Sequence, residues 1–162
     1  MQVRKYVGVG AASVLLAGAA WMGLASATAS GSTDNNAISS GGDTLRFVAT
    51  EVEVTEIDLG EAGFSQGDQI VFADDLLRGG SKFGTAGGVC TLVRASGDPE
   101  YSCEVTYRLP RGAITGHALL RASELPVVRF AITGGTAAFD EVAGQGRSLL
   151  QDTAPVVLHL ED

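Results

Sequence analysis

Carboxylate side chains spaced along strand-like segments are the residues of this chain best suited to chemistry. They are Glu51, Glu53, Glu56, Asp58, Asp68, Asp74 and Asp75. Residues two apart on a β-strand share a face, so Glu51 and Glu53 are expected to lie together, as are Phe72 and Asp74. A carboxylate pointing into an apolar interior is desolvated, which raises its pKa and suits it to proton transfer or to stabilising a developing cation. The alternative is a solvated outer face, where most carboxylates of an acidic protein lie.

Other motifs that could mark an active site are weaker. Residues 63–67 spell the G-x-S-x-G pattern of a hydrolase nucleophile. That pattern needs a strand before it and a helix after it in an α/β domain. Here it lies in a polar loop of a chain whose other segments are strand-like, so we expect a Gly-rich turn instead. His117 and His159 are far apart in the chain, and no metal site is predicted. No glycine pattern fits the P-loop or the dinucleotide fingerprint.

The first 29 residues have the pattern of a cleavable secretory signal peptide. Arg4 and Lys5 form a short positive region, residues 7–24 are uncharged and mostly apolar, and residues 25–29 contain overlapping A-x-A cleavage patterns. An uncleaved membrane anchor is the alternative, since about 18 apolar residues almost span a bilayer. We expect cleavage, which predicts a secreted protein without membrane contact after signal removal.

The remainder of the chain is predicted to be a short arm and one acidic domain. Residues 30–43 are polar and rich in turn formers, as in a flexible arm, and residues 44–162 suffice for a single domain. Loss of Arg4 and Lys5 with the signal peptide changes the formal net charge from −8 to −10. Because an acidic domain repels nucleic acid and anionic lipid headgroups, neither is expected as a partner.

Strand-like segments with turn signals between nearly all of them fill the domain. They are residues 47–57, 69–73, 89–95, 100–109, 113–122, 126–133, 145–151 and 155–160, and the one helix-like piece is a turn at 137–142. This pattern is typical of an all-β sandwich or barrel. Consecutive short hairpins favour an eight-stranded antiparallel up-and-down barrel, because closure removes the exposed edge strands.

Two cysteines, Cys90 and Cys103, lie on either side of a turn-like segment at residues 96–99. If this segment closes a hairpin, the cysteines lie on neighbouring strands, and an exported protein can keep a disulfide. Whether they face each other depends on the register, since a one-residue slip sends a side chain to the opposite face. The sequence leaves open whether they are bonded.

Several segments resemble successive parts of the plant allene oxide cyclases. They are residues 53–60, 66–77, 87–93 and 130–146, of which the last, FAITGGTAAFDEVAGQG, is the most distinctive. That block and VFADDLL at residues 71–77 also resemble the plant dirigent proteins, which share the fold. The resemblance extends from about Thr44 to Leu160 and is specific for the superfamily, not for either activity.

The resemblance implies an eight-stranded antiparallel barrel with an apolar cavity of ligand size, a homotrimeric assembly, and neither metal nor organic cofactor. Allene oxide cyclases close an unsaturated epoxide fatty acid to one cyclopentenone stereoisomer. Dirigent proteins steer the coupling or cyclisation of radicals or quinone methides. In both families a steric mould and a few polar groups orient an already reactive substrate.

Residue by residue, the resemblance implies that Glu53 is the catalytic group, because it matches a cyclase glutamate that interacts with charge delocalised over the substrate. Phe72 matches a cavity aromatic residue and Cys90 a cavity cysteine. Asp74 stands where the cyclases have an asparagine that helps to hold a bound water, and Thr55 replaces a second asparagine of that water site. We therefore predict Thr55, Phe72, Asp74 and Cys90 as substrate-binding residues.

Two functions agree with these features. The first is a secreted, cofactor-independent cyclase or dirigent-like protein that binds an apolar unsaturated small molecule and steers its cyclisation or coupling. The second is a non-catalytic extracellular carrier of an apolar small molecule. A third reading, a structural module with a packed interior, is distinguished by cavity volume, since a ligand pocket needs roughly 300 Å³ or more.

Overall fold

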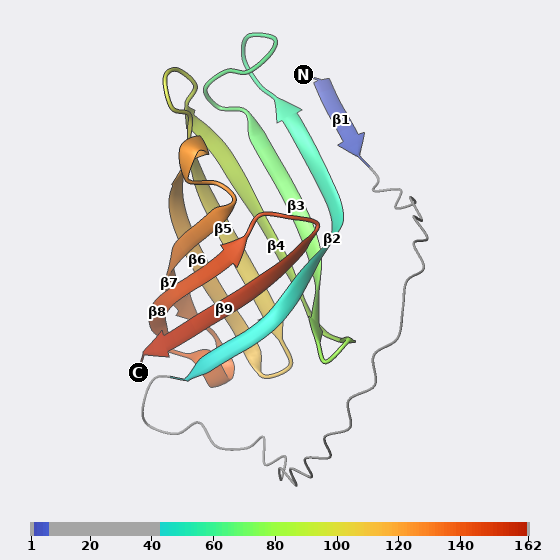
Figure 1. Cartoon of the computed structure of the whole chain (residues 1–162), viewed down its shortest axis with the longest axis vertical. Coiled ribbons are helices and arrows are strands. Elements are labelled where there is room, and N and C mark those ends of the chain that lie inside the picture. The colour runs from blue at the N-terminus through green and yellow to red at the C-terminus, as the bar shows by residue number, and fades with distance from the viewer. Residues whose placement is uncertain (1, 7–42, 162) are drawn as a thin grey trace, which may run out of the picture.

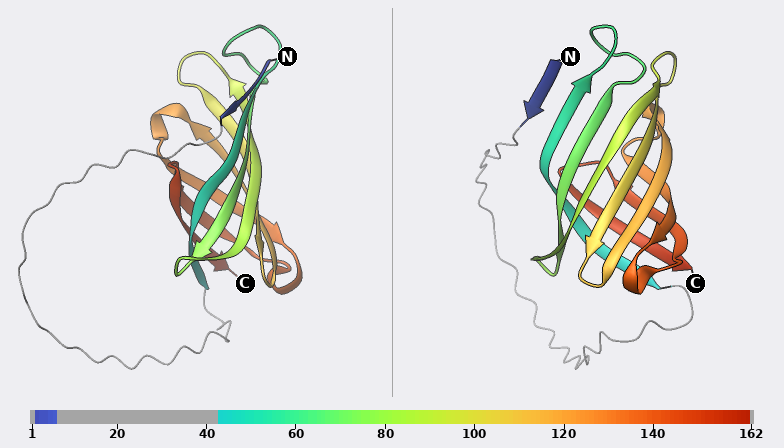
Figure 2. Two further views of the ribbon diagram at one scale, coloured as in Figure 1. Left: turned by 90° about the vertical axis from the view of Figure 1, so that its right-hand side faces the viewer. Right: turned by 180° about the vertical axis from the view of Figure 1, so that it is seen from behind.

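The computed structural model describes residues 2–6 and 43–161, whose strands form one antiparallel sheet that closes on itself (Figures 1 and 2). The strands are β1 (Gln2–Tyr6), β2 (Thr44–Asp58), β3 (Gln69–Arg78), β4 (Ser81–Arg94), β5 (Glu100–Leu109), β6 (Gly112–Arg121), β7 (Val127–Gly135), β8 (Ala143–Leu149) and β9 (Thr153–Glu161). Two 3-10 turns, η1 (Ala122–Glu124) and η2 (Ala137–Phe139), precede β7 and β8. Strands β2 to β9 pair in chain order, and β2 also pairs with β9. The predicted eight-stranded up-and-down barrel is confirmed.

The predicted signal peptide, residues 1–29, and the predicted arm, residues 30–43, lie almost wholly outside the described residues. Of these segments the structure describes residue 43 and residues 2–6, which form β1. This strand pairs antiparallel with residues 54–58 of β2, outside the closed barrel. In the described part of the chain, no helix is long and apolar enough to cross a membrane. The signal peptide and the flexible arm therefore stay predictions.

β2 leaves its neighbour β9 halfway along its length. The pairing with β9 runs from Thr44 to Thr50, and the Glu51 N–H then donates to the Asp152 carbonyl at 3.3 Å. A β-bulge follows between Glu51 and Glu53, where β2 gains one residue relative to β3. Because a bulge bends and twists its strand, the second half of β2 stands away from β9 at the end of the barrel that carries the β2–β3 loop (Figure 1).

β4 begins at Ser81, well before the strand predicted at residues 89–95. The unexpected part contains Gly84, Gly87 and Gly88, and glycine weakens a strand because it has no side chain to pack. Here the missing side chains permit close packing. A Cβ atom at Gly84 would lie 2.4 Å from the Arg108 carbonyl oxygen. Tertiary packing therefore overrides the low strand propensity of this segment.

The end of the barrel opposite the β2–β3 loop is filled by a packed apolar core. The Phe47 ring lies edge-on to the rings of Phe83 and Tyr107, with centroids 5.7 Å and 5.4 Å away, and Tyr107 stacks on Phe130 at 6.0 Å. Further buried side chains of this core include Leu76, Ile114, Ile132, Leu158 and Leu160. The aromatic cluster closes the barrel interior and forms the floor of the space above it.

The Phe130 ring fits because two other strands present glycine to it. An added Cβ atom would lie 2.1 Å from the ring at Gly146 and 2.6 Å from it at Gly116. Phe130 is only 7% exposed, so its ring cannot turn into solvent to make room. Glycine at these positions is therefore a packing requirement of the barrel wall.

We predict that Gly146→Ala lowers the free energy of unfolding by about 1–3 kcal/mol, the usual cost of overpacking a core. Urea denaturation measures this change. Phe130→Leu, which shortens the obstructing side chain, should partly rescue the alanine variant in the double mutant, because the two residues touch. Strictly additive effects of the two substitutions would contradict this account.

Candidate functional site

The half of the barrel nearest the β2–β3 loop holds a cavity of about 460 Å³. Most of its wall is apolar, including Val54, Ile70, Phe72, Val105, Ala118, Leu120, Val128 and Val156, with Tyr101 and Tyr107. Small residues in the middle of the barrel, Ala49, Gly116 and Ala154, leave this space open. Because the volume exceeds the roughly 300 Å³ of small ligand pockets, the interior of the barrel is not simply packed.

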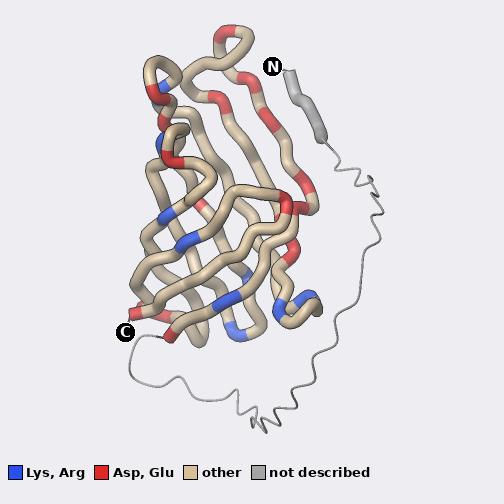
Figure 3. Tube along the Cα trace, viewed as in Figure 1, with Lys and Arg blue, Asp and Glu red and all other residues tan. Residues whose placement is uncertain are grey.

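The charged residues that line the cavity are all acidic. They are Glu51, Glu56, Asp74 and Glu104, and no Lys, Arg or His lines it within the described residues. Glu104 alternates with the inward-facing Cys103 and Val105, so its side chain is directed outward. The other three carboxylates lie on β2 and β3, and Figure 3 shows acidic residues along the second half of β2.

The bulge in β2 decides which glutamate faces the cavity. Glu51 lies directly opposite Asp74, whereas Glu53 lies opposite Ala73. Directly opposed residues share a face of the sheet, and Asp74 lines the cavity, so Glu51 faces inward and Glu53 outward. The expectation that Glu51 and Glu53 share a face is therefore wrong, because the bulge inserts one residue between them.

The structure brings three of the predicted site residues together and separates the other two from them. Phe72, Asp74 and Cys90 all line the cavity. Glu53 and Thr55 are not among the lining residues, and they lie on the outer face of β2 beyond the bulge. The sequence argument did not identify Glu51 as the inward partner of Asp74, since a bulge has no distinctive residue pattern here.

Asp74 is the lining carboxylate whose environment most changes its chemistry. It is half-buried, and desolvation, followed by the nearby charges of Glu51 and Asp75, raises the pKa of this carboxyl above its usual range. Two carboxylates on opposed strand positions repel each other, which favours the protonated form of one. The arrangement therefore provides a proton donor or acceptor next to an apolar space.

Tyr107 supplies a second polar group at the floor of the cavity, and sequence reasoning did not single it out. Burial, and to a lesser extent the Asp74 carboxylate, raises the pKa of the Tyr107 phenol. The phenol therefore stays protonated at neutral pH and can donate a hydrogen bond to an oxygen or nitrogen of a bound molecule.

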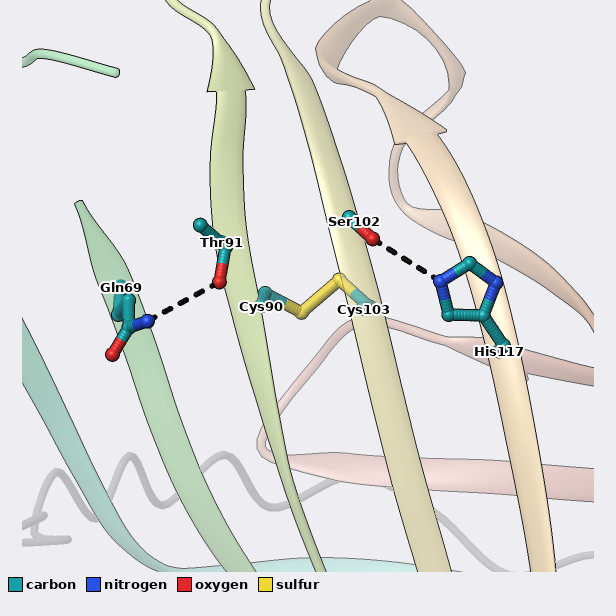
Figure 4. Close-up of a disulfide and its surroundings, with 6 residues drawn as sticks. All are labelled: Gln69, Cys90, Thr91, Ser102, Cys103 and His117. Atoms are coloured by element: carbon teal, nitrogen blue, oxygen red, sulfur yellow. Dashed lines mark hydrogen bonds between the residues drawn. A yellow bond between two sulfur atoms is a disulfide. The ribbon is translucent and has the colours of Figure 1, made fainter. Parts of the chain in front are cut away.

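A disulfide between Cys90 and Cys103 forms part of the cavity wall (Figure 4). The two residues are directly opposed on β4 and β5, with Cα atoms 4.0 Å apart. Their neighbours Thr91 and Ser102 make hydrogen bonds with Gln69 and His117 respectively, from the alternate strand positions. The sequence left the register of these two strands open. In the structure both sulfur atoms face inward, so Cys90 lines the cavity and is bonded to Cys103 at the same time.

The G-x-S-x-G segment lies in the β2–β3 loop, as its interpretation as a turn predicts. The Ser65 hydroxyl donates to the Leu59 carbonyl at 2.8 Å, and no helix follows it. Among the described residues, no group of three or more His, Cys, Asp or Glu side chains is arranged to hold a metal ion.

No protein-family model and no curated protein sequence matches this chain. Solved structures do resemble it. Pyocyanin demethylase is 27% identical with a TM-score of 0.68, over 73% of this chain and 99% of that one. An exo-specific intermolecular Diels-Alderase is 11% identical with a TM-score of 0.60, over 74% and 98%. A pterocarpan synthase dirigent protein is 17% identical with a TM-score of 0.53, over 74% and 88%.

These similarities identify the class of protein at the level of the fold. The chain has the barrel of the superfamily that includes the allene oxide cyclases and the dirigent proteins, as the sequence resemblance predicted. The barrel is used by enzymes with different reactions, so the activity of this chain has to be argued from its own cavity.

We predict that Asp74→Asn raises the free energy of unfolding at neutral pH. The folded state favours the protonated carboxyl, because the pKa of Asp74 is raised. The ionised carboxylate thus opposes folding above the raised pKa, and this penalty disappears as the pH falls below about 3.9, the ordinary pKa of aspartate. Thermal unfolding at several pH values should show a stabilised variant at about pH 7 and no difference near pH 3.

Asp75→Asn is the matched control for this experiment. Asp75 neighbours Asp74 but faces outward and forms an ion pair with Lys82 at 2.6 Å. Loss of this surface pair should cost no more than about 1 kcal/mol, partly offset because the Asp75 charge also raises the pKa of Asp74. An equal advantage of Asp74→Asn at every pH would show that ionisation of Asp74 is not what opposes folding.

Proposed function

We propose that this protein binds a flat, unsaturated, largely apolar small molecule in the barrel cavity and steers its cyclisation or coupling without an organic cofactor. The observation that carries the proposal is the composition of the cavity wall: a predominantly apolar surface interrupted by Glu51, Glu56 and Asp74 on β2 and β3. Such a wall orients an apolar ligand and places charge at one defined point of it. We further propose that the protein acts after export.

The charge of the wall defines the ligand more closely. With carboxylates and no basic side chain among the described lining residues, an anionic ligand is disfavoured. A ligand that carries a positive charge, or develops one during the reaction, is attracted to Glu51 and Asp74 in a space of reduced dielectric constant. A conjugated nitrogen heterocycle or a cationic intermediate of a ring closure meets this requirement.

The polar groups have separate roles in this proposal. Glu51 takes the electrostatic role that the sequence resemblance gave to Glu53, because it is the glutamate on the inner side of the bulge. Asp74, with its raised pKa, transfers a proton to or from the ligand. Tyr107 donates a hydrogen bond from the floor. Phe72 and the disulfide provide apolar contact surface next to them.

The similarity to pyocyanin demethylase supports a flat conjugated ring as the ligand, since 99% of that chain is covered at 27% identity. It also favours a second candidate function, the demethylation of such a ring, in which water takes up the methyl carbon as formaldehyde and the conjugated ring itself takes up the two electrons. Incubation with pyocyanin, followed by mass spectrometry of the products, tests it directly. If the unaltered protein forms a demethylated product and the Asp74→Asn variant does not, demethylation takes the place of cyclisation or coupling as the function of the cavity.

We predict that proflavine, a flat tricyclic cation, binds the protein more tightly than phenazine, a neutral tricycle of similar shape. Asp74→Asn should weaken proflavine binding roughly five- to thirty-fold, as expected for the loss of one close, partly desolvated charge pair. Glu51→Gln should weaken it about two- to fivefold, because Glu51 is exposed. Neither substitution should change phenazine binding by more than about twofold. Fluorescence titration measures the proflavine affinity, and competition measures that of phenazine.

Glu53→Gln is the matched comparison, because it removes the same charge from the outer face of the same strand. Its proflavine affinity should equal that of the unaltered protein. If Glu53→Gln weakens binding and Glu51→Gln does not, the assignment of the charged role to Glu51 is wrong. If neither tricycle binds at all, the cavity is not a site for flat unsaturated ligands. Binding of conjugated compounds without turnover of any of them would favour the carrier function.

A further inference from the structure

A second hollow of about 560 Å³ lies under the β2–β3 loop, next to the main cavity. It is lined by Glu56, Ile57, Asp58, Ala62, Gly63, Phe64, Asp68, Gln69, Ile70, Leu92 and Tyr101. Glu56, Ile70 and Tyr101 line the main cavity as well. The two spaces therefore share a wall at the mouth of the barrel, and we call the second one the vestibule.

The loop that covers the vestibule is held in place by hydrogen bonds to its own residues. The Asp68 carboxylate accepts from the N–H of Leu59 at 2.9 Å and from the N–H of Ser65 at 2.7 Å. These backbone hydrogen bonds lower the pKa of Asp68, so it stays ionised. The N–H of Gly67 donates to the carbonyl of Leu92 on β4 at 2.8 Å. These hydrogen bonds therefore fix the position of the loop over the vestibule.

The loop carries an aromatic side chain over the mouth of the barrel. Phe64 is 59% exposed, although a phenylalanine gains most from full burial. Its ring lies edge-on to Tyr101, with the ring centroids 6.5 Å apart. Tyr101 is on the inward-facing row of β5, above Cys103, and it lines both spaces. The pair presents aromatic surface to the vestibule that no other described residue covers.

The charge of the vestibule matches that of the main cavity. Glu56, Asp58 and Asp68 line it, with no Lys, Arg or His among the described lining residues. One carboxylate oxygen of Asp58 accepts from the N–H of Gly63. The Asp68 carboxylate already accepts hydrogen bonds from the backbone of the loop. Glu56 remains at the boundary of the two spaces, where it can face a cationic ring held on either side.

We propose that the vestibule is a second ligand subsite, which binds a flat unsaturated ring against Phe64 and Tyr101, so that each chain holds two rings at once. This inference rests on the proposed function and deepens it. Of the reactions considered there, coupling needs two reactants side by side, and the shared wall at Glu56, Ile70 and Tyr101 places them so.

Proflavine at concentrations where the free dye is monomeric tests the proposal, with stoichiometry measured by equilibrium dialysis of the purified protein. Two molecules should bind per chain. Phe64→Ala should weaken one of the two sites about three- to tenfold, as expected for the loss of one aromatic contact, and leave the other within about twofold. Asp74→Asn should weaken mainly the other site. Phe64→Trp, which keeps the aromatic surface, should retain both.

Leu119→Ala is the control, since Leu119 is 58% exposed on the outer face of β6, away from both spaces. A single proflavine per chain that responds to Asp74→Asn would overturn the vestibule and leave the proposed function standing. Two molecules that are both insensitive to Phe64→Ala would place the second one elsewhere and also overturn it. No binding at all would overturn both proposals.

Discussion

The one-residue bulge in β2 is the constraint on which the site depends. Before it, β2 closes the barrel by pairing with β9, and after it, β2 belongs to an open part of the sheet. The same residue shift turns Glu51 inward and Glu53 outward. The bulge thus both ends the closure of the barrel and selects the side chain that faces the cavity, in keeping with the frequent position of bulges at barrel rims.

The two ends of the barrel serve different physical purposes. At one end, rings and branched aliphatic side chains interdigitate, and glycines on neighbouring strands make room for them. This packing, together with closure, stabilises a sheet whose other half is hollow. The hollow half contains features that oppose folding, such as the half-buried Asp74 beside Glu51. Sites of this kind are commonly less stable than the scaffold that carries them.

The polar groups of the cavity are few. They include a disulfide, two phenols and the carboxylates of Glu51, Glu56 and Asp74. They can orient a reactive molecule, stabilise positive charge on it and move one proton, which suits a ligand already poised to react. In the proposed function, the shape of the apolar wall selects the product, and the carboxylates select the charge of the ligand.

The sequence by itself determined the fold class and three residues of the cavity wall. Alternating strands, turn residues at regular intervals and the block at residues 130–146 led to the closed barrel. The resemblance to the allene oxide cyclases assigned Phe72, Asp74 and Cys90 to the cavity, and all three line it. Only the tertiary structure decided between Glu51 and Glu53, since the bulge shifts that period by one residue without a distinctive residue type. The disulfide also needed the structure, because it depends on the register of the β4–β5 hairpin. The cavity volume needed it because side chains from strands distant in sequence line the same space.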